Sequence, residues 1–145
     1  MSFTFTDENL AKIKELKKRY PSPEALCLPC LWMAQRQDGF IKIDAIDEIS
    51  KHTTLPPMEI YRVATFYTMF TLSPYEKLNV QVCKTLSCKL CGSDAILERL
   101  KSKDVNVTHV ECLGSCGTAP VMQINDMNYE NLTPDKVDSI LEELS

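Results

Sequence analysis

The sequence has no excess of basic residues and no long uncharged apolar run. Its 145 residues include 16 Lys and Arg against 20 Asp and Glu, so the net charge is −4. Such a balance predicts no basic patch for nucleic acid or for an anionic membrane surface. Residues 1–20 carry too many charges for a signal peptide or a membrane span. We therefore expect a cytoplasmic protein, or one bound to a larger assembly from the cytoplasmic side, with no nucleic-acid partner and no direct membrane insertion.

Glycine is also scarce, with 4 residues in the chain, and none belongs to a G-x-G-x-x-G motif or a P-loop. The chain is therefore not expected to bind a nucleotide cofactor itself. Cysteine, by contrast, is abundant, and the 7 cysteines are an odd number that cannot all pair. In a reducing compartment, so many cysteines indicate metal or redox chemistry more often than disulfides.

The first half of the chain, residues 1–73, has the pattern of a helical bundle. Apolar residues recur at helical spacing in four short stretches, which begin near Asp7, Pro23, Asp44 and Pro57. Asp44 is expected to cap the third helix and Pro29 to kink the second. Helices this short need to pack against one another or against a partner.

The second half, residues 74–145, has a mixed pattern of strands and helices. It predicts strands over about 77–83 and 105–111, a helix over about 92–102, a hairpin from 120–124 and 127–131, and a last helix from Pro134. The order β-α-β-β-β-α suggests a small thioredoxin-like α/β sheet. We expect the peptide bond before Pro120 to be cis, because thioredoxin-like sheets often place a cis-proline beside the active loop.

Four cysteines follow the first two predicted strands, and they are the candidate metal ligands. Cys83 and Cys88 lie after one strand, and Cys112 and Cys116 after the other. Soft thiolate donors select iron–sulfur clusters or zinc over harder ions. We expect Lys84 and Lys89, which flank the first pair, to offset part of the negative charge of such a centre.

The spacing alone leaves two ligand sets open. Cys83-x4-Cys88-x2-Cys91 with one more distant cysteine matches the plant-type ferredoxin pattern. The alternative is a site of two pairs. We favour two pairs, because residues 92–94 indicate a helix start beside Cys91, whereas Cys112 and Cys116 share one glycine-bearing loop. In that loop Gly114 and Gly117 are expected to direct backbone N–H groups at sulfur.

Several short runs resemble one family when taken together. They are 64–70 (ATFYTMF), 82–88 (VCKTLSC), 111–116 (ECLGSC), 119–121 (APV) and 131–134 (NLTP). The chain is similar to the thioredoxin-like [2Fe-2S] subunits of NADH:quinone oxidoreductase, the respiratory complex I. Equivalent subunits serve NAD-linked hydrogenases and formate dehydrogenases. Cys91 departs from the pattern, since family members commonly carry another residue there.

The resemblance implies an α+β fold, with an N-terminal helical bundle followed by a thioredoxin-like [2Fe-2S] ferredoxin domain that has a small mixed sheet. It implies that Cys83, Cys88, Cys112 and Cys116 hold one [2Fe-2S] cluster. The chain would accept single electrons from the FMN of a partner flavoprotein that oxidises NADH, within a peripheral arm on the cytoplasmic face of a membrane. It would be an accessory redox subunit, without catalytic residues of its own.

Two other classes of function compete with this interpretation. One is a zinc-stabilised assembly module, in which the same four cysteines hold zinc. The other is a thiol–disulfide oxidoreductase that uses Cys27 and Cys30, or Cys88 and Cys91. We expect Cys27 and Cys30 to be core residues, because they lie on the apolar face of a predicted helix. Cys91 is expected to be a spectator, and His52 and His109 to have ordinary structural roles.

Overall fold

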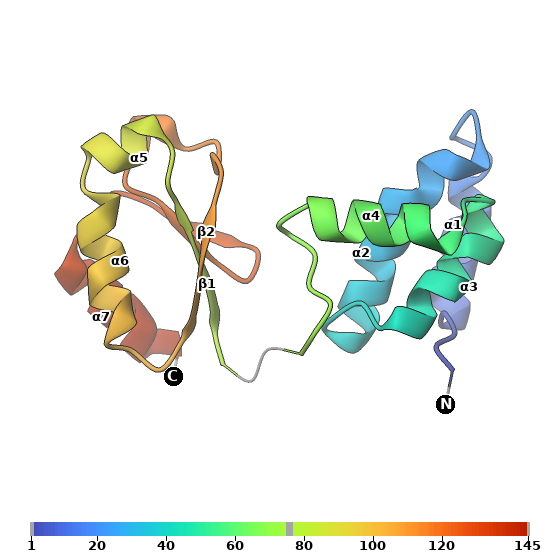
Figure 1. The fold of residues 1–145 in the computed structure, drawn as a ribbon, viewed down its shortest axis with the longest axis horizontal. Coiled ribbons are helices and arrows are strands. Elements are labelled where there is room, and N and C mark those ends of the chain that lie inside the picture. Colours follow the sequence, from blue (N-terminus) through green and yellow to red (C-terminus); the bar gives the residue numbers. More distant parts are fainter. Residues whose placement is uncertain (1, 75–76, 145) are drawn as a thin grey trace. The chain divides into compact units, whose positions relative to one another are not determined.

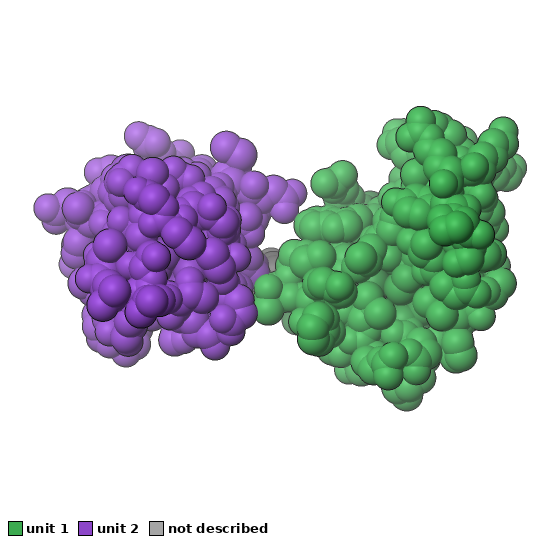
Figure 2. All heavy atoms as spheres, turned by 90° about the horizontal axis from the view of Figure 1, so that it is seen from above, with its two compact units in different colours: residues 1–74 green, residues 75–145 purple. Residues whose placement is uncertain are grey.

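The computed structural model describes residues 2–74 and 77–144, and the chain divides into two compact units, residues 1–74 and residues 75–145 (Figures 1 and 2). Residues 75, 76 and 145, which belong to the second expected domain, lie outside the described residues. Among the described residues no helix combines the length and the apolar character that a membrane crossing requires.

The first unit is helical, as the sequence predicts. Its elements are α1 (Asp7–Leu16), the 3-10 helix η1 (Pro23–Leu26), α2 (Cys27–Asp38), α3 (Ile43–Thr53) and α4 (Pro57–Phe66). Thr6 caps α1 by accepting a hydrogen bond from the N–H of Asn9. Gly39 ends α2 with a φ of 81°, a left-handed conformation that glycine adopts without steric cost. These local signals explain why the helices begin and end where they do.

Two expectations about this unit need correction. Asp44 does not cap α3, because Lys42 occupies the N-cap and the Asp44 carboxylate accepts a hydrogen bond of 2.8 Å from the N–H of Phe3. Pro29 lies in the first turn of α2 rather than in its interior. A proline there removes no helical hydrogen bond, since the first N–H groups of a helix have no partner within it. The change in helix geometry falls before Cys27, where η1 gives way to α2.

One apolar core holds the four helices of this unit together. Its fully buried side chains come from every helix and include Ile13, Leu31, Ile49 and Ile60. Gln35 fastens the segment after α4 to α2, because its side-chain amide donates to the carbonyl of Met69 and accepts from the N–H of Thr71, at 2.8 Å each.

The second unit contains a four-stranded mixed sheet with two helices on one face (Figure 1). Its elements are β1 (Asn79–Cys83), α5 (Leu86–Leu90), α6 (Ser93–Lys101), β2 (Asn106–Val110), the 3-10 helix η2 (Cys116–Thr118), β3 (Met122–Ile124), β4 (Met127–Tyr129) and α7 (Pro134–Leu144). The strand order is β2-β1-β3-β4, and β1 is parallel to β2 and antiparallel to β3. This is the expected α+β, thioredoxin-like arrangement.

Alternation along the strands explains the core of the second unit. Val80 and Val82 of β1 pair with Ile124 and Met122 of β3, and all four are buried. They lie on the face that α6 and α7 cover, and they form one cluster with side chains such as Leu100 of α6 and others from α7. A period of two thus directs every second residue of these strands toward the helices.

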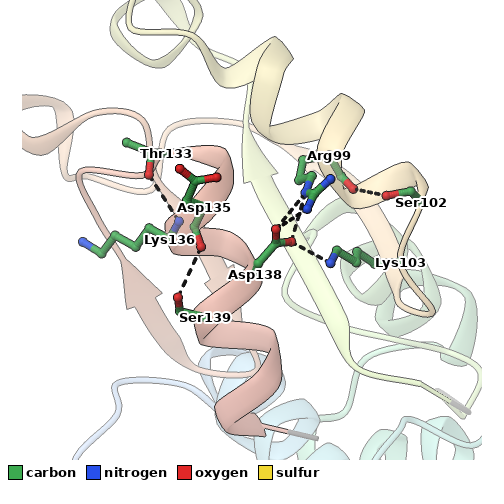
Figure 3. A network of polar contacts seen from close by, with 8 residues as sticks. All are labelled: Arg99, Ser102, Lys103, Thr133, Asp135, Lys136, Asp138 and Ser139. Atoms are coloured by element: carbon green, nitrogen blue, oxygen red, sulfur yellow. Dashed lines mark hydrogen bonds and ion pairs between the residues drawn. The ribbon is translucent and has the colours of Figure 1, made fainter.

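The two covering helices are also joined by a polar network (Figure 3). Asp138 of α7 accepts two hydrogen bonds of 3.0 Å from Nε of Arg99 and forms an ion pair of 2.6 Å with Lys103. The Arg99 guanidinium and the Lys103 ammonium lower the pKa of Asp138 to about 2. The helix α7 begins at Pro134, as predicted, and the hydroxyl of Thr133 caps it by accepting a 3.2 Å hydrogen bond from the N–H of Lys136.

Candidate metal centre

The four candidate cysteines lie at one edge of the sheet. Cys83 is the last residue of β1, and Cys112 comes two residues after the end of β2. The two strands are parallel and Cys83 pairs with Val110, so their carboxyl ends meet at the same edge. Cys88 lies in α5 and Cys116 begins η2, and these two short helices are in contact.

The short helix α5 was not predicted from the sequence. It begins after Thr85, two residues beyond the end of β1, and it places Cys88 on a helix. It buries Cys88, whereas its apolar residues Leu86 and Leu90 are exposed. The turn of α5 brings the second cysteine back toward the first, because residues in one helical turn rise only a few ångströms.

The cysteines form two pairs with different exposure. Cys83 and Cys88 are buried, with 1% and 2% of their surface exposed, and they pack with Val121, Leu113 and Ala119. Cys112 and Cys116 are exposed, and their sulfur atoms are 3.4 Å apart. Each cysteine of one pair also interacts electrostatically with a cysteine of the other. The centre therefore has an inner, dry pair and an outer pair at the surface.

Hydrogen-bond donors surround the sulfur atoms. The N–H of Gly114 donates to the sulfur of Cys112 at 3.4 Å, and the Thr85 hydroxyl lies 3.1 Å from the sulfur of Cys83. Backbone N–H groups of Leu113 and Val121 act on Cys83 and Cys88 in the same way. The prediction for Gly114 is confirmed, and that for Gly117 stays a prediction. Gly114 has a φ of 83°, which places it in the left-handed region that favours glycine.

Within each pair, the two thiols differ in the direction in which their pKa is shifted. Burial raises the pKa of Cys88 to about 11. Burial is the largest single influence on Cys83 and acts to raise its pKa, but the hydrogen bonds from Thr85, Cys88 and the Leu113 backbone together lower that pKa below the ordinary value. In the outer pair, the Gly114 N–H lowers the pKa of Cys112, and the hydrogen bond with Cys112 raises the pKa of Cys116. Each pair thus joins one thiol with a lowered pKa, Cys83 or Cys112, to one with a raised pKa, Cys88 or Cys116.

The grouping of the four thiols in twos fits a two-iron cluster. In the described residues, 2–74 and 77–144, neither these cysteines nor any other set of three His, Cys, Asp or Glu side chains is arranged as a site for a single ion. A [2Fe-2S] cluster takes four thiolates, two on each iron, and the thiols here are grouped in twos. Soft sulfur donors with N–H groups directed at them also suit this cofactor.

The remaining three cysteines lie outside this group. Cys27 and Cys30 are buried in the core of the first unit, as predicted, and burial raises the pKa of Cys30 to about 12. Cys91 follows α5 and is exposed.

The two lysines beside the first pair form ion pairs with carboxylates, Lys84 with Glu111 at 3.1 Å and Lys89 with Asp94 at 2.7 Å. Their expected role in offsetting charge at the centre stays a prediction. The hydrogen bonds that the sulfur atoms receive come from backbone N–H groups and the Thr85 hydroxyl.

The peptide bond between Ala119 and Pro120 is cis, as predicted, and it lies just before Val121, whose N–H acts on Cys88. His52 lies at the end of α3, 3.3 Å from Glu48, and His109 is exposed in β2. Neither histidine takes part in the centre.

Comparison with known proteins identifies relatives over nearly the whole chain. The E-type subunit of the NADH-quinone oxidoreductase of Rickettsia bellii is 43% identical over 99% of this chain and 95% of its own length. The corresponding protein of Rickettsia conorii is 39% identical with the same coverage. The mitochondrial NADH dehydrogenase [ubiquinone] flavoprotein 2 of Dictyostelium discoideum is 37% identical over 98% of this chain, which spans 64% of that protein.

Solved structures confirm the fold. The NAD+-reducing [NiFe]-hydrogenase in its H2-reduced state matches 86% of this chain with a TM-score of 0.65 at 20% identity, and the match covers 22% of the hydrogenase chain. The family model for the thioredoxin-like [2Fe-2S] ferredoxins matches residues 13–145. The protein therefore belongs to the thioredoxin-like [2Fe-2S] ferredoxin family, and its cofactor is a [2Fe-2S] cluster.

Proposed function

We propose that the chain is the electron-transfer subunit of a NADH-quinone oxidoreductase-type complex, and that Cys83, Cys88, Cys112 and Cys116 are its cluster ligands. In this role it accepts single electrons from the FMN of a partner flavoprotein that oxidises NADH. The observation that carries the proposal is the convergence of two thiol pairs at the carboxyl ends of β1 and β2, in a chain that aligns over 95% of the length of its Rickettsia bellii relative. We propose further that the complex places it on the cytoplasmic face of a membrane, and that the expected domains 1–73 and 74–145 are its bundle and its cluster domain.

The residues around the sulfur atoms account for how the chain would serve this cofactor. When bound, a [2Fe-2S] cluster supplies one-electron chemistry. Val121 and Leu113 shield the inner thiols from water. The N–H groups of Gly114 and Val121 and the hydroxyl of Thr85 favour negative charge on sulfur. The exposed pair, Cys112 and Cys116, marks the side from which a partner can approach.

A second candidate for the parent complex is a soluble hydrogenase, because the same fold occurs in the NAD+-reducing [NiFe]-hydrogenase. The hydrogenase shares 20% sequence identity with this chain, and the match covers 22% of the hydrogenase chain. The match to the Rickettsia bellii protein covers 95% of that protein's length. The NADH-quinone oxidoreductase role is therefore the better supported of the two.

Replacement of single cysteines by serine tests the ligand set. Cys83→Ser, Cys88→Ser, Cys112→Ser and Cys116→Ser should each lose the cluster or change its EPR spectrum, because a hydroxyl is a poor substitute for a soft thiolate. Cys91→Ser is the matched control, three residues from Cys88, and should keep both the cluster content and the spectrum. Loss of the cluster in Cys91→Ser, with retention in Cys116→Ser, would support the plant-type ligand set instead.

Reduction by NADH tests the partner. The anaerobic chain should show no reduced-cluster signal with NADH alone, and should show it with NADH once the co-expressed FMN-containing subunit is present. Dithionite serves as the positive control for a functional cluster. A dithionite-reducible cluster that stays oxidised with NADH and the flavoprotein would contradict the proposed electron donor.

A further inference from the structure

A groove runs between α1 and α2 in the helical unit, and none of the seven cysteines lines it. It has a volume of about 330 Å³, and the side chains that line it come from two helical segments, with Lys12, Glu15, Leu16 and Arg19 on one side and Pro29, Trp32, Met33 and Arg36 on the other. Both sets follow the spacing i, i+3, i+4, i+7, which puts the residues within each helix on one face, and Arg19 lies in the turn that follows α1.

The floor of the groove is apolar and firmly held. Leu16, Trp32 and Met33 are half-buried, and they pack against the core of the unit. The Trp32 ring meets Phe70 edge to face, with ring centroids 5.3 Å apart. Trp32 is the only tryptophan of the chain. Aromatic residues, Met and Arg are enriched in protein interfaces, and Trp and Arg often carry most of the binding energy there.

The rim of the groove is positively charged. Three cations, Lys12, Arg19 and Arg36, line it against the single carboxylate of Glu15, in a chain whose net charge is −4. Lys12 pairs with Glu8 at 2.6 Å and Arg19 with Glu15 at 3.1 Å.

Arg36 differs from the other two cations. Its guanidinium lies 5.2 Å from the centroid of the Trp32 ring, and it forms no ion pair with any described residue. A guanidinium held over an aromatic face is positioned to bind a carboxylate from outside the chain.

We propose that this groove binds an acidic amphipathic segment of another subunit. Two apolar side chains at helical spacing would lie on Trp32 and Met33, and Asp or Glu side chains beside them would pair with Arg19 and Arg36. Binding of an amphipathic helix in an apolar groove with complementary charges at the rim is a recurrent mode of recognition. This inference depends on one part of the proposed function, namely that the chain assembles with partner subunits.

The charge of the rim distinguishes a partner from a second copy of this chain. A symmetric dimer through the groove would bring the same rim of both copies together. Each rim carries three cations and one carboxylate, so two facing rims would bring together an excess of positive charge, and like charges across an interface are unfavourable. A partner with carboxylates has no such cost.

Photo-crosslinking identifies what occupies the groove. Met33 is replaced by p-benzoylphenylalanine in the full chain, which is co-expressed with the other subunits and irradiated, and the crosslinked peptide is sequenced by mass spectrometry. Ile43, an apolar residue with 63% of its surface exposed outside the groove, receives the same probe as a control. We expect Met33 alone to crosslink to a segment of another subunit that carries apolar residues three or four apart and at least two carboxylates. No crosslink beyond the Ile43 control, a crosslink to a second copy, or one to a segment without acidic residues would overturn the proposal.

Charge reversal then tests the rim. The variant Arg19→Glu/Arg36→Glu should lower the yield of the Met33 crosslink by about tenfold or more, because it turns attraction into repulsion. The matched control is Lys18→Glu/Arg62→Glu, which changes the charge equally and also breaks one surface ion pair, but lies outside the groove. Equal yields in the two variants would contradict the proposal.

Two readouts keep this test separate from the folding of the variants and from the proposed function. The far-ultraviolet circular dichroism of each isolated variant, compared with that of the wild type, shows whether the helical unit is folded. The EPR signal of the NADH-reduced complex tests electron transfer. If the wild-type complex gives no such signal although the Met33 crosslink forms, the proposed electron donor is contradicted and the proposed binding groove is not.

Discussion

At the scale of single residues, cysteine side chains have three different environments in this chain. The four cysteines of the candidate centre meet N–H or hydroxyl donors or one another. Cys27 and Cys30 are surrounded by apolar side chains, and Cys91 lies in solvent. The sequence distinguishes these cases through their neighbours, because Cys27 and Cys30 share a helical apolar face whereas the others follow strands. It contains no comparable signal for the Thr85 hydroxyl at Cys83, which depends on the turn into α5.

Replacement of Cys30 by serine tests its structural role. Cys30 has 0% of its surface exposed, so the hydroxyl of Cys30→Ser would be buried among apolar atoms and should lower the free energy of unfolding by about 1–3 kcal/mol. Cys91→Ser, at an exposed position, should change it by less than about 0.5 kcal/mol. Denaturant unfolding of the two cluster-loaded variants measures the difference. Equal losses, or a loss of the cluster in Cys30→Ser without unfolding, would argue against a purely structural Cys30.

At the scale of elements, local signals predicted most helices and strands and missed those that depend on distant contacts. The strands alternate with a period of two, and Thr133 with Pro134 marks the start of α7, so these elements could be predicted. The five residues of α5 are too few to show a helical period. The capping role assigned to Asp44 was wrong because its carboxylate binds Phe3, 41 residues away in the sequence. Contacts of this kind are not visible in a local pattern.

The ion pairs between α6 and α7 predict how stability depends on pH. The pKa of Asp138 is lowered from 3.8 to about 2, so its contribution is complete above its unfolded pKa and is lost as the pH falls through the folded one. Asp138→Asn should therefore be less stable than the wild type above about pH 5, and the difference should shrink toward zero as the pH approaches 2. Thermal unfolding at a series of pH values measures it, with Glu142→Gln on the same helix, which has no ion pair with Arg99 or Lys103, as the control. A difference that does not change with pH would contradict this account.

At the scale of the whole molecule, the chain joins two units that have separate cores. The side chains of one core all come from residues 3–72, and those of the others from residues 78–141. All four candidate ligands belong to the second unit. The resemblance covered both halves of the chain, but the groove between α1 and α2 could not be foreseen, since it depends on which faces of two separate helices meet.

The separate cores predict that the cluster does not need the helical unit. Residues 75–145 expressed alone should fold and bind the [2Fe-2S] cluster with the stoichiometry of the full chain, because units with their own core commonly fold by themselves. Residues 1–74 alone should be helical and bind no iron. Iron content and circular dichroism measure both outcomes. A cluster that forms only in the full chain would show that the helical unit contributes to the site.

The central claim is that this chain, without any partner, holds one two-iron cluster that takes up a single electron. The most direct measurement is the EPR spin count of the anaerobically purified chain after dithionite reduction, made together with iron, zinc and acid-labile sulfide analysis. We predict about one unpaired spin, two irons and two sulfides per chain, and no zinc. A colourless chain with stoichiometric zinc and no EPR signal would contradict the account.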